Sequence, residues 1–496
     1  MTMNNVNEKR HLIRTTIAVV LGVIIVGTSE AGNDRVSGRT IGMARTFTAS
    51  SRGLDAIGLN PANLALDDRG STVTFEVAPF GFRAGSDLIN YQIYQDYFTG
   101  VDSLGANGQP ALDRNGKKVR IGTLLSESDK DAILALFNGD VAHTQFNFDL
   151  TEFGITYRNE KLGGFGFSVS DRVGVNMDIP EGYARMVLGG FPAAGANYTL
   201  DNTSVNASWL REYNLSYARM LPFELQWVKN ISVGIGIKYV QGFGYFATDH
   251  YTGSIQIVPN TITLDDGSKI TVPGPLSAKV DFLQYQAHVP FDSVVVSNFV
   301  SKPAGTGIGF DFGVSGEVFQ ALRVGVSLTD IGKVTWNKYT KAIVGKGSFS
   351  ISDYQRQQDS VKNAFKGDTH DTTSFKSSLP GALNVGAAFQ VDEAPFITHF
   401  PGKLLVAADI HFGFNNEPGN SKTPRFSLGT EYRPIGAIPI RTGISIGGRE
   451  RFSWALGIGI NTPIWDLDFG TESIALLTNP NSFRNGSFTF GMRFRI

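Results

Sequence analysis

The chain has 496 residues, of which 42% are hydrophobic, 18% are charged and 57 are glycine, a composition typical of a folded, sheet-rich protein rather than a disordered one. It contains no cysteine, which excludes disulfides, thiolate metal sites and cysteine nucleophiles. The 44 Lys and Arg residues balance 45 Asp and Glu residues to a net charge of -1, so we expect no nucleic acid among its partners.

Residues 1–31 are predicted to be a secretory signal peptide. Lys9, Arg10 and Arg14 form a charged start, residues 17–26 are an apolar run, and Ser29-Glu30-Ala31 places small residues before cleavage at Gly32. A run of this length is about half of the ~20 apolar residues that a membrane-spanning helix needs. We therefore expect export by the Sec route rather than a membrane anchor.

Beyond residue 31, many segments alternate apolar residues with small or polar ones, as expected of strands with one apolar face. The last one places Phe488, Phe490, Met492, Phe494 and Ile496 on a single face. Such alternation, without any long apolar helix, predicts an all-β, transmembrane antiparallel β-barrel over residues 71–496. The candidate strands are 73–83, 146–158, 165–176, 208–219, 230–243, 279–289, 307–316, 321–330, 382–391, 403–413, 425–433, 438–447, 452–461, 465–473 and 487–496.

These candidates are about fifteen, but bacterial single-chain barrels have even strand numbers. We expect about 14 strands, with one candidate outside the barrel that the pattern does not identify. Short turns at 159–164, 433–437 and 447–451 contrast with long connections at 84–145, 177–207, 243–278 and 331–380, as in barrels with periplasmic turns and long extracellular loops. Helices are predicted in two of these loops, at 129–137 after Ser126 and at 351–365.

Residues 41–49 read IGMARTFTA and residues 53–65 read GLDAIGLNPANLA. This run resembles the N-terminal segment of the FadL and PorV group of outer-membrane barrels, and glycine-rich strands at 307–313, 324–332 and 383–389 extend the resemblance. It implies that residues 32–70 form a hatch inside the lumen, with Asn60, Pro61, Ala62 and Leu64 as its central motif. Pro61 cannot continue a helix and Asn60 can bind nearby backbone, so we expect a rigid turn that closes a short helix at 53–59. Arg45-Thr46 departs from the small residues of the resembled motif.

Charged residues lie opposite the apolar faces of several candidate strands and are expected to face the lumen. They are Arg211, Lys238, Asp409, His411, Glu431, Arg441, Arg493 and Arg495. Two roles remain open for them, since they either line a passage or pair with each other and with the hatch.

No catalytic site is expected. Residues 443–447 match the Gly-x-Ser-x-Gly pattern of serine hydrolases, but Ser445 lies within an alternating strand instead of at a strand-to-helix turn. The seven histidines show no metal-ligand spacing. We therefore predict no enzyme activity, no cofactor and no metal.

Two functions follow from the resemblance, both in the outer membrane of a Gram-negative bacterium and in contact with its lipid. A FadL-type channel binds and admits hydrophobic small molecules such as long-chain fatty acids, and its plausible linings here are Leu136, Phe137, Phe243, Tyr245 and Phe246. A PorV-like platform instead binds secretion-system or cargo proteins through its long loops. Aromatic side chains folded inward favour the channel, and aromatic side chains at loop tips favour the platform.

Overall fold

The computed structural model describes residues 37–496 except 89, 105–107, 115, 123, 138–140, 190–194, 227, 289–301, 352–364 and 475–483. The predicted signal peptide and most of the helix predicted at 351–365 lie outside the described residues. The helical elements are α2 (Gly38–Gly42), η1 (Gly53–Ala56), η2 (Pro61–Ala65), α3 (Tyr91–Ile93), η3 (Tyr94–Phe98), α4 (Glu127–Leu134), η4 (Ala135–Phe137), α5 (Glu181–Gly189) and η6 (Val391–Glu393). None of the helices in the described ranges is long and apolar enough to cross a bilayer.

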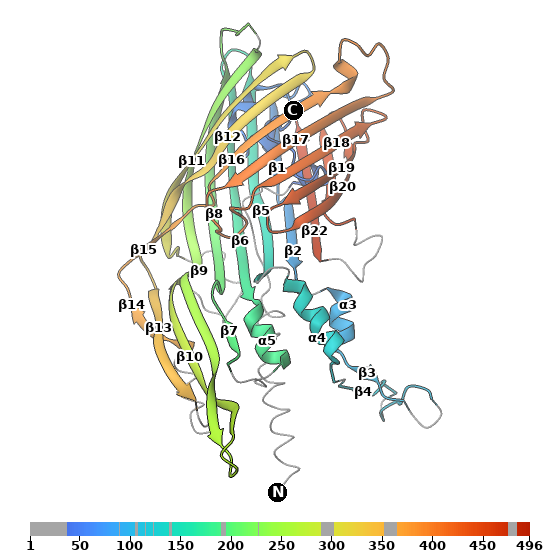
Figure 1. Ribbon diagram of the computed structural model, residues 1–496. Helices are drawn as coiled ribbons and strands as arrows, with labels where there is room; N and C mark the ends of the chain where they lie inside the picture. The colour runs from blue at the N-terminus through green and yellow to red at the C-terminus, as the bar shows by residue number, and fades with distance from the viewer. Residues whose placement is uncertain are drawn as a thin grey trace.

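The strands account for most of the described chain (Figure 1). They are β1 (Val73–Val77), β2 (Phe80–Ser86), β3 (Val101–Asp102), β4 (Arg120–Ile121), β5 (Val141–Asn159), β6 (Gly163–Pro180), β7 (Asn197–Thr199), β8 (Ser204–Met220), β9 (Lys229–Thr263), β10 (Lys269–Ala287), β11 (Gly305–Phe319), β12 (Leu322–Trp336), β13 (Thr340–Ile351), β14 (Asp368–Asp371), β15 (Phe375–Ser378), β16 (Ala382–Gln390), β17 (Lys403–Gly413), β18 (Arg425–Arg433), β19 (Ile440–Gly447), β20 (Arg451–Asn461), β21 (Trp465–Thr471) and β22 (Asn485–Arg495).

An antiparallel ring of strands forms the barrel. Around the ring the order is β1 with β2, β5, β6, β8, β9, β11, β12, β16, β17, β18, β19, β20, β21 and β22, and β22 pairs with both β1 and β2 to close it. β1 and β2 are one strand interrupted at Ala78, whose φ of 53° breaks the extended backbone. Counted so, the described ring has the fourteen strands that the alternation predicted.

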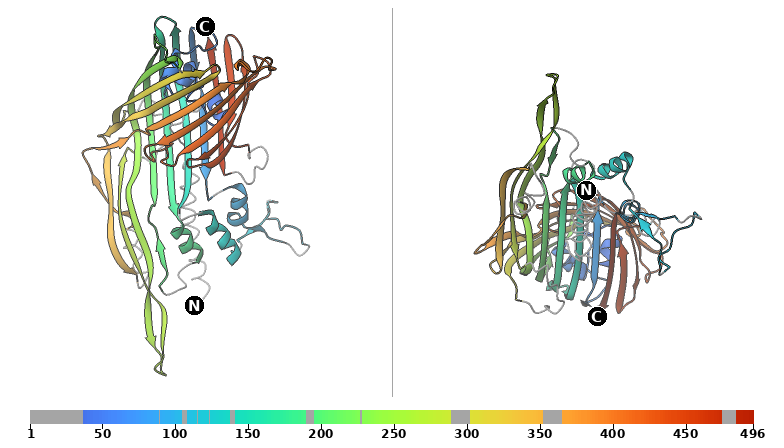
Figure 2. Two further views of the ribbon diagram at one scale, coloured as in Figure 1. Left: turned by 45° about the horizontal axis from the view of Figure 1, so that its top comes forward. Right: turned by 90° about the horizontal axis from the view of Figure 1, so that it is seen from below.

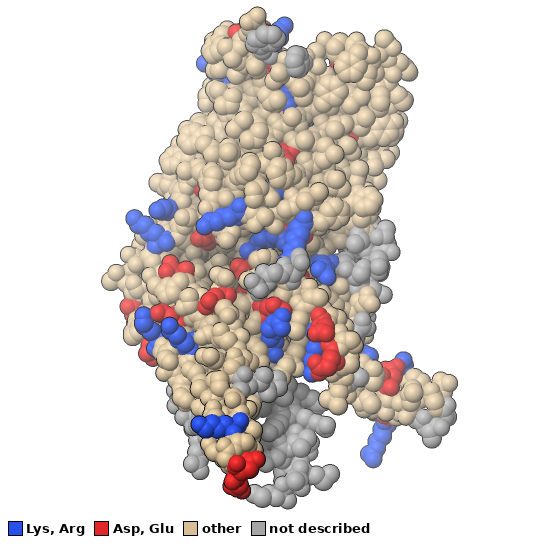
Figure 3. Space-filling view, viewed as in Figure 1, with Lys and Arg blue, Asp and Glu red and all other residues tan. Residues whose placement is uncertain are grey.

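The barrel wall follows from the period-two pattern of its sequence. On β9, Ile235, Ile237 and Tyr239 point outward and are 40–48% exposed, whereas Lys238 and Val240 lie on the alternate, inward face and are fully buried. On the face shown in Figure 3, the half of the molecule toward the short turns carries few charged side chains. The outward surface of the barrel is therefore apolar in a broad band.

The two ends of the barrel differ. The turns after β5, β11, β18 and β20 lie at the end drawn uppermost in Figure 1, here called the short-turn end, and the connections that carry α3, α4 and α5 lie at the opposite, long-loop end. Ser126 caps α4 through a capping box with Asp129, so the helix predicted after Ser126 is confirmed. The short turn at 447–451 was expected on the same side of the barrel as the turns at 159–164 and 433–437. It lies instead at the long-loop end, because β19 begins at the short-turn end and runs to the opposite end of the barrel.

A sheet formed by the second part of β9 with β10, β13 and β14, here called the extension sheet, continues the wall beyond the ring at the long-loop end (Figure 2). The first part of β9, to Gly242, pairs with β11, whereas its second part, from Tyr245 to Thr263, pairs with β10. β10 also pairs with β13, which pairs with β14. The candidate strand outside the ring is therefore 279–289, and the connection at 331–380 contains three strands that local alternation did not predict.

Candidate functional site: the plugged lumen

The N-terminal segment 37–70, here called the hatch segment, lies inside the ring and contacts strands on several sides of it. Asn60 is buried, and its side-chain Oδ1 accepts a hydrogen bond from Ala62 N at 3.2 Å. Pro61 takes the first position of η2, where its fixed φ suits a helix start. The predicted turn does not close a helix over 53–59, because η1 ends at Ala56 and Asn60 instead begins η2.

Inward-facing glycines of the wall make room for the hatch segment. A Cβ atom on Gly457 would lie 2.8 Å from the Cα atom of Gly42, and a Cβ atom on Gly234 would lie 2.4 Å from Ala62 N. At Gly313 a Cβ atom would lie 2.0 Å from the Asn60 side chain. The hatch segment and wall therefore meet nearly backbone to backbone, and this contact accounts for the glycine-rich inner face of the strands.

The backbone conformation at Ala44 and Arg45 explains why the resembled motif has small residues at these positions. Its φ is 66° and that of Ala44 is 51°, a left-handed backbone that favours glycine. The guanidinium of Arg45 lies 3.3 Å from Glu450 and 2.5 Å from Glu472, so ion pairs hold the side chain in place. Burial opposes the charge of Glu450, yet Arg45 and Arg83 lower the pKa of Glu450 to about 2.

Two of the predicted lumen-facing residues on β22 hold the hatch segment. The guanidinium of Arg493 donates to both carboxylate oxygens of Asp55, at 2.9 and 3.0 Å. Arg495 lies 2.8 Å from Asp68 and 2.7 Å from Asp466. Although burial opposes the charge of Asp55, Arg493 keeps the pKa of Asp55 below its usual range.

Glu431 on β18 and Arg441 on β19 form a second group of ion pairs that holds the hatch segment. Glu431 accepts from Arg441 Nε at 2.6 Å and from Arg39 Nε of the hatch segment at 3.1 Å. The other end of the Arg441 guanidinium donates to Asp468 at 2.6 Å. The lumenal charges predicted on these strands thus pair with the hatch segment and with each other.

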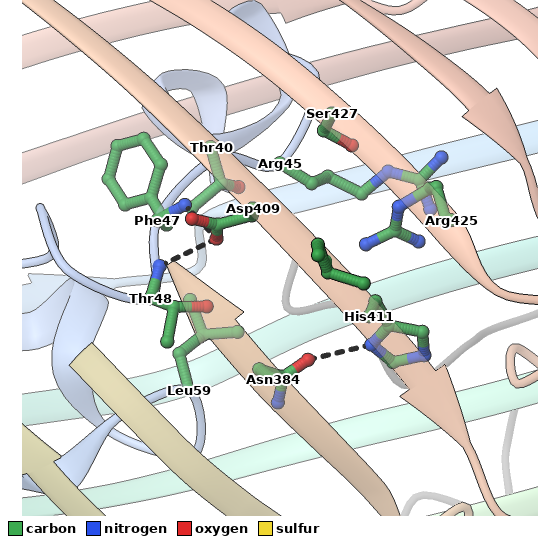
Figure 4. Close-up of a pocket in the computed structure, with 11 residues that line it drawn as sticks. Thr40, Arg45, Phe47, Thr48, Leu59, Asn384, Asp409, His411, Arg425 and Ser427 are labelled. Atoms are coloured by element: carbon green, nitrogen blue, oxygen red, sulfur yellow. Dashed lines mark hydrogen bonds between the residues drawn. The ribbon is translucent and has the colours of Figure 1, made fainter. Parts of the chain in front are cut away.

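Asp409 and His411 line a small cavity between the hatch segment and β16 to β18 (Figure 4). Asp409 accepts hydrogen bonds from Phe47 N and Thr48 N, both at 2.8 Å. His411 Nδ1 lies 2.7 Å from the Asn384 side-chain oxygen. The cavity measures about 20 Å³, which is room for about one water molecule. The cavity is a packing gap between the hatch segment and the barrel wall, and it is too small for an organic ligand.

Lys238 lies at the centre of a buried charge network on the wall. Its ammonium contacts Asp330 and lies 3.0 Å from Asp311, and Arg172 donates to Glu212 at 2.6 Å. The sequence predicted Lys238 but missed its four charged neighbours. Glu212 lies within the predicted strand 208–219, and the alternation of that strand places it on the same inward face as Asn214 and Ser216.

Arg211 does not face the lumen as predicted. It is opposite Asp171 in the pairing of β6 and β8, on the face opposite the inward Arg172 and Glu212. Its guanidinium lies 2.7 Å from Asp171 and 2.7 Å from Glu152. The alternation of β8 already gives this orientation, because Arg211 lies on the same face as Tyr213 and the 61% exposed Leu215, whereas its neighbour Glu212 lies on the buried face.

The connection between β17 and β18, residues 414–424, here called the crossing loop, reaches over the lumen. The side-chain amide of Asn176, on β6 at the opposite side of the ring, donates to the carbonyl oxygens of Asn416 and Glu417 at 3.2 Å. Tyr245 Oη donates to Glu417 at 3.1 Å. Burial raises the pKa of the partly buried Glu417 to about 7, and the hydrogen bond from Tyr245 only partly offsets this rise.

The turn at 447–451 also folds inward and adds to this closure. Arg449 contacts Asp178 of β6 and lies 3.4 Å from the carbonyl oxygen of Met177. Within the described part of the chain, the lumen is thus blocked by the hatch segment toward the short turns and by the crossing loop and this turn toward the long loops.

The five predicted ligand-lining residues do not share one surface. Tyr245 stacks on Trp336 with ring centroids 5.1 Å apart, within a buried apolar cluster on the lumen wall that Phe375 joins. The ring of Phe243 packs at a tilt against Trp209 and lies under the guanidinium of Arg211, whereas Phe246 is half-buried. Leu136 and Phe137 belong to η4, which contacts β5. Of the five, Tyr245 is the residue next to the crossing loop.

Solved structures resemble the chain only distantly. The toluene transporter TbuX of Ralstonia pickettii is 14% identical with a TM-score of 0.44, covering 94% of this chain and 99% of the transporter. A FadL homologue of Pseudomonas aeruginosa is 11% identical with a TM-score of 0.42, covering 94% and 99%. Identities this low, with TM-scores below 0.5, carry no conclusion about what this chain binds.

Sequence comparison is more decisive about the family. No curated protein sequence matches the chain. Residues 90–469 match the model described as a family of unknown function, DUF5723. This match spans more than half of the sequence, and the chain therefore belongs to the DUF5723 family.

Proposed function

We propose that this protein is an outer-membrane channel that binds hydrophobic small molecules at its long-loop end and admits them through a gated lumen. The observation that carries the proposal is the aromatic column of Tyr245, Trp336 and Phe375 on the lumen wall, next to the crossing loop. Apolar and aromatic surface with a few polar groups is the usual lining of small-molecule sites.

The placement in the membrane rests on the outward surface. Apolar side chains such as Phe312, Ile237 and Leu428 are 44–48% exposed on the barrel exterior, as lipid-facing residues of a transmembrane barrel are. The predicted signal peptide and the resemblance of residues 41–65 to the FadL and PorV group support export to the outer membrane. In this placement the short-turn end faces the periplasm and the long-loop end faces outward.

The closed lumen suits a gated channel. A ligand on the aromatic column is separated from the periplasm by the charge network around Lys238 and by the hatch segment. Entry therefore requires the crossing loop to leave Tyr245, and exit requires the hatch segment to loosen from Arg493 and Glu431. In this proposal, ion pairs of the lumenal charges hold the hatch segment in place, and the apolar site lies on their long-loop side.

The test compares two tryptophan variants in the full chain, purified in mild detergent. Trp336→Leu removes the centre of the aromatic column, and Trp454→Leu is the matched control because Trp454 is 47% exposed on the outer face. Binding of a long-chain fatty acid, followed by native mass spectrometry, should weaken about 5-fold to 150-fold in Trp336→Leu, since a lost aromatic contact costs about 1–3 kcal/mol. Equal binding by both variants would refute the aromatic site.

A platform for secreted or surface-attached proteins is the second candidate, and the extension sheet favours it. The hairpin tip of β9 and β10 exposes Val258, Ile262, Leu264 and Ile270 at 37–43% each. Such side chains at a protruding tip fit a protein partner. Crosslinking in the native cell from a cysteine placed in this cysteine-free chain tests it. A stoichiometric protein partner, lost on shortening the hairpin, together with an empty lumen would favour the platform over the channel.

A further inference from the structure

A patch of two lysines and three hydroxyl residues lies on the outer surface where the barrel meets the extension sheet. In the register of β11, β12 and β15, Thr306 is opposite Thr335, which is opposite Lys376. One step nearer the short turns, Ile308 is opposite Lys333, which is opposite Ser378. These positions point outward because Val334, Trp336 and Ser377, which alternate with them, are buried on the inner side. Lys333, Lys376, Thr306, Thr335 and Ser378 are here called the lysine patch.

The lysine patch borders the apolar band directly. On the neighbouring strand, Ile308, Phe310 and Phe312 are 56%, 38% and 44% exposed and continue from this border toward the short turns. Figure 3 shows Lys and Arg side chains in a row at the corresponding border of the sparsely charged half, with Asp and Glu side chains beyond it. The patch therefore lies where lipid head groups would meet the barrel.

The two lysines are available to a ligand. Both side chains are exposed, and among the described residues neither forms an ion pair with a carboxylate. Asp371 is in the same sheet but stands opposite Lys341, farther out along β13. The patch thus carries two positive charges and three hydroxyl donors on one face.

We propose that the lysine patch binds the phosphate group of an anionic lipid of the outer leaflet, of the lipid A type. The proposal rests on the membrane placement given above but not on transport. Residues directly opposite in a sheet have Cβ atoms about 4.5–5.5 Å apart and diagonal neighbours about 7–8 Å apart. Lysine side chains reach across such a spacing, so both ammonium groups and the Thr335 hydroxyl can contact one phosphate, while the acyl chains lie along Ile308 and Phe310.

The experiment uses the full chain, purified in detergent and depleted of lipid, with lipid retention counted by native mass spectrometry. The probes are diphosphorylated lipid A, monophosphoryl lipid A and zwitterionic phosphatidylethanolamine, with inorganic phosphate as a competitor. The test variant is Lys333→Gln with Lys376→Gln. The matched control is Lys161→Gln with Lys229→Gln, because these exposed lysines lie at the short-turn end.

We expect the wild type and the control to retain diphosphorylated lipid A in preference to the other two lipids. The test variant should retain at least about tenfold less of it, since a lysine near an anionic lipid surface contributes about fivefold. Inorganic phosphate should not displace the lipid if the acyl chains contribute.

Equal loss in both variants, equal retention of all three lipids, or full displacement by phosphate would overturn the lipid assignment. A separate result tests the proposed placement of the barrel in the outer membrane. A chain that remains soluble without detergent would contradict the membrane placement itself, whatever the lysines bind.

Discussion

Glu417 offers the sharpest test of the crossing loop as a gate. Its carboxyl group accepts from Tyr245 in a partly buried place, and burial raises its pKa to about 7. When the crossing loop opens, Glu417 is exposed to water and its pKa returns to its ordinary value of 4.5. The closed form therefore binds more protons than the open form between these two pH values, and closure weakens as the pH rises through this window.

The size of the effect follows from this difference. A pKa difference of one unit corresponds to about 1.4 kcal/mol, so closure should lose about 2–3 kcal/mol between pH 4.5 and pH 7 after allowance for the partial solvent contact of Glu417. The opening equilibrium should then rise by about 30-fold to 150-fold. Glu417→Gln keeps an acceptor for Tyr245 and carries no charge, so its closure should be independent of pH.

Hydrogen exchange of the amides at 414–424 measures this opening, once the intrinsic pH dependence of exchange is divided out. Glu393→Gln is the control, because Glu393 is exposed in η6 at the short-turn end. The wild type and the control should open more above pH 7 than below pH 4.5, and Glu417→Gln should not. The same pH response in Glu417→Gln would refute the assignment of the gate to this carboxyl group.

Three further substitutions test the plug and the wall. Arg493→Met leaves the buried Asp55 with the more distant Arg39, 3.7 Å away, at a cost of up to about 3–5 kcal/mol, so hydrogen exchange at 37–70 should rise sharply while the barrel signal in circular dichroism remains. Gly457→Val should lower the unfolding temperature in calorimetry because its Cβ atom would meet the hatch segment, whereas Gly436→Val, with open space around it, should leave that temperature unchanged. Lys238→Met leaves several buried carboxylates uncompensated and should abolish the heat-modifiable folded band in gel electrophoresis.

The strand pattern was predictable because its period is local. Phe488, Phe490 and Met492 alternate with small and polar residues, and β22 places them on the outer face as predicted. The pattern could not show which strands pair. Residues 279–287 alternate as well, yet they belong to β10, whose partners on β9 and β13 place it outside the ring.

The lumenal charges show a second limit. The inward faces of Arg441, Arg493 and Arg495 were predicted from their own strands, and pairing with each other and with the hatch was one of the two roles left open, but the individual hatch residues that pair with them were not identified. Asp55 is 438 residues before Arg493 in the chain, and their contact depends on the register of the whole ring. Pairing across such a separation leaves no trace in local spacing.

Arg211 was placed on the wrong face of a regular strand. It alternates with the buried Glu212 and shares the outward face of Tyr213 and Leu215, and the extra residue of the nearby register shift lies on β9, so β8 keeps its alternation. The hatch motif was recognised by resemblance, whereas the crossing loop gave no signal because residues 414–424 lack both periodicity and a motif.

The position of Arg493 and Arg495 on β22 has a consequence for assembly. β22 is the strand that joins β21 to β1 and β2, so it completes the ring. The same strand carries the two guanidinium groups that bind Asp55 and Asp68 of the hatch segment. Completion of the barrel and docking of the plug are therefore coupled through one strand, and a ring that closes without its plug leaves Arg493 without Asp55 and Arg495 with Asp466 but without Asp68.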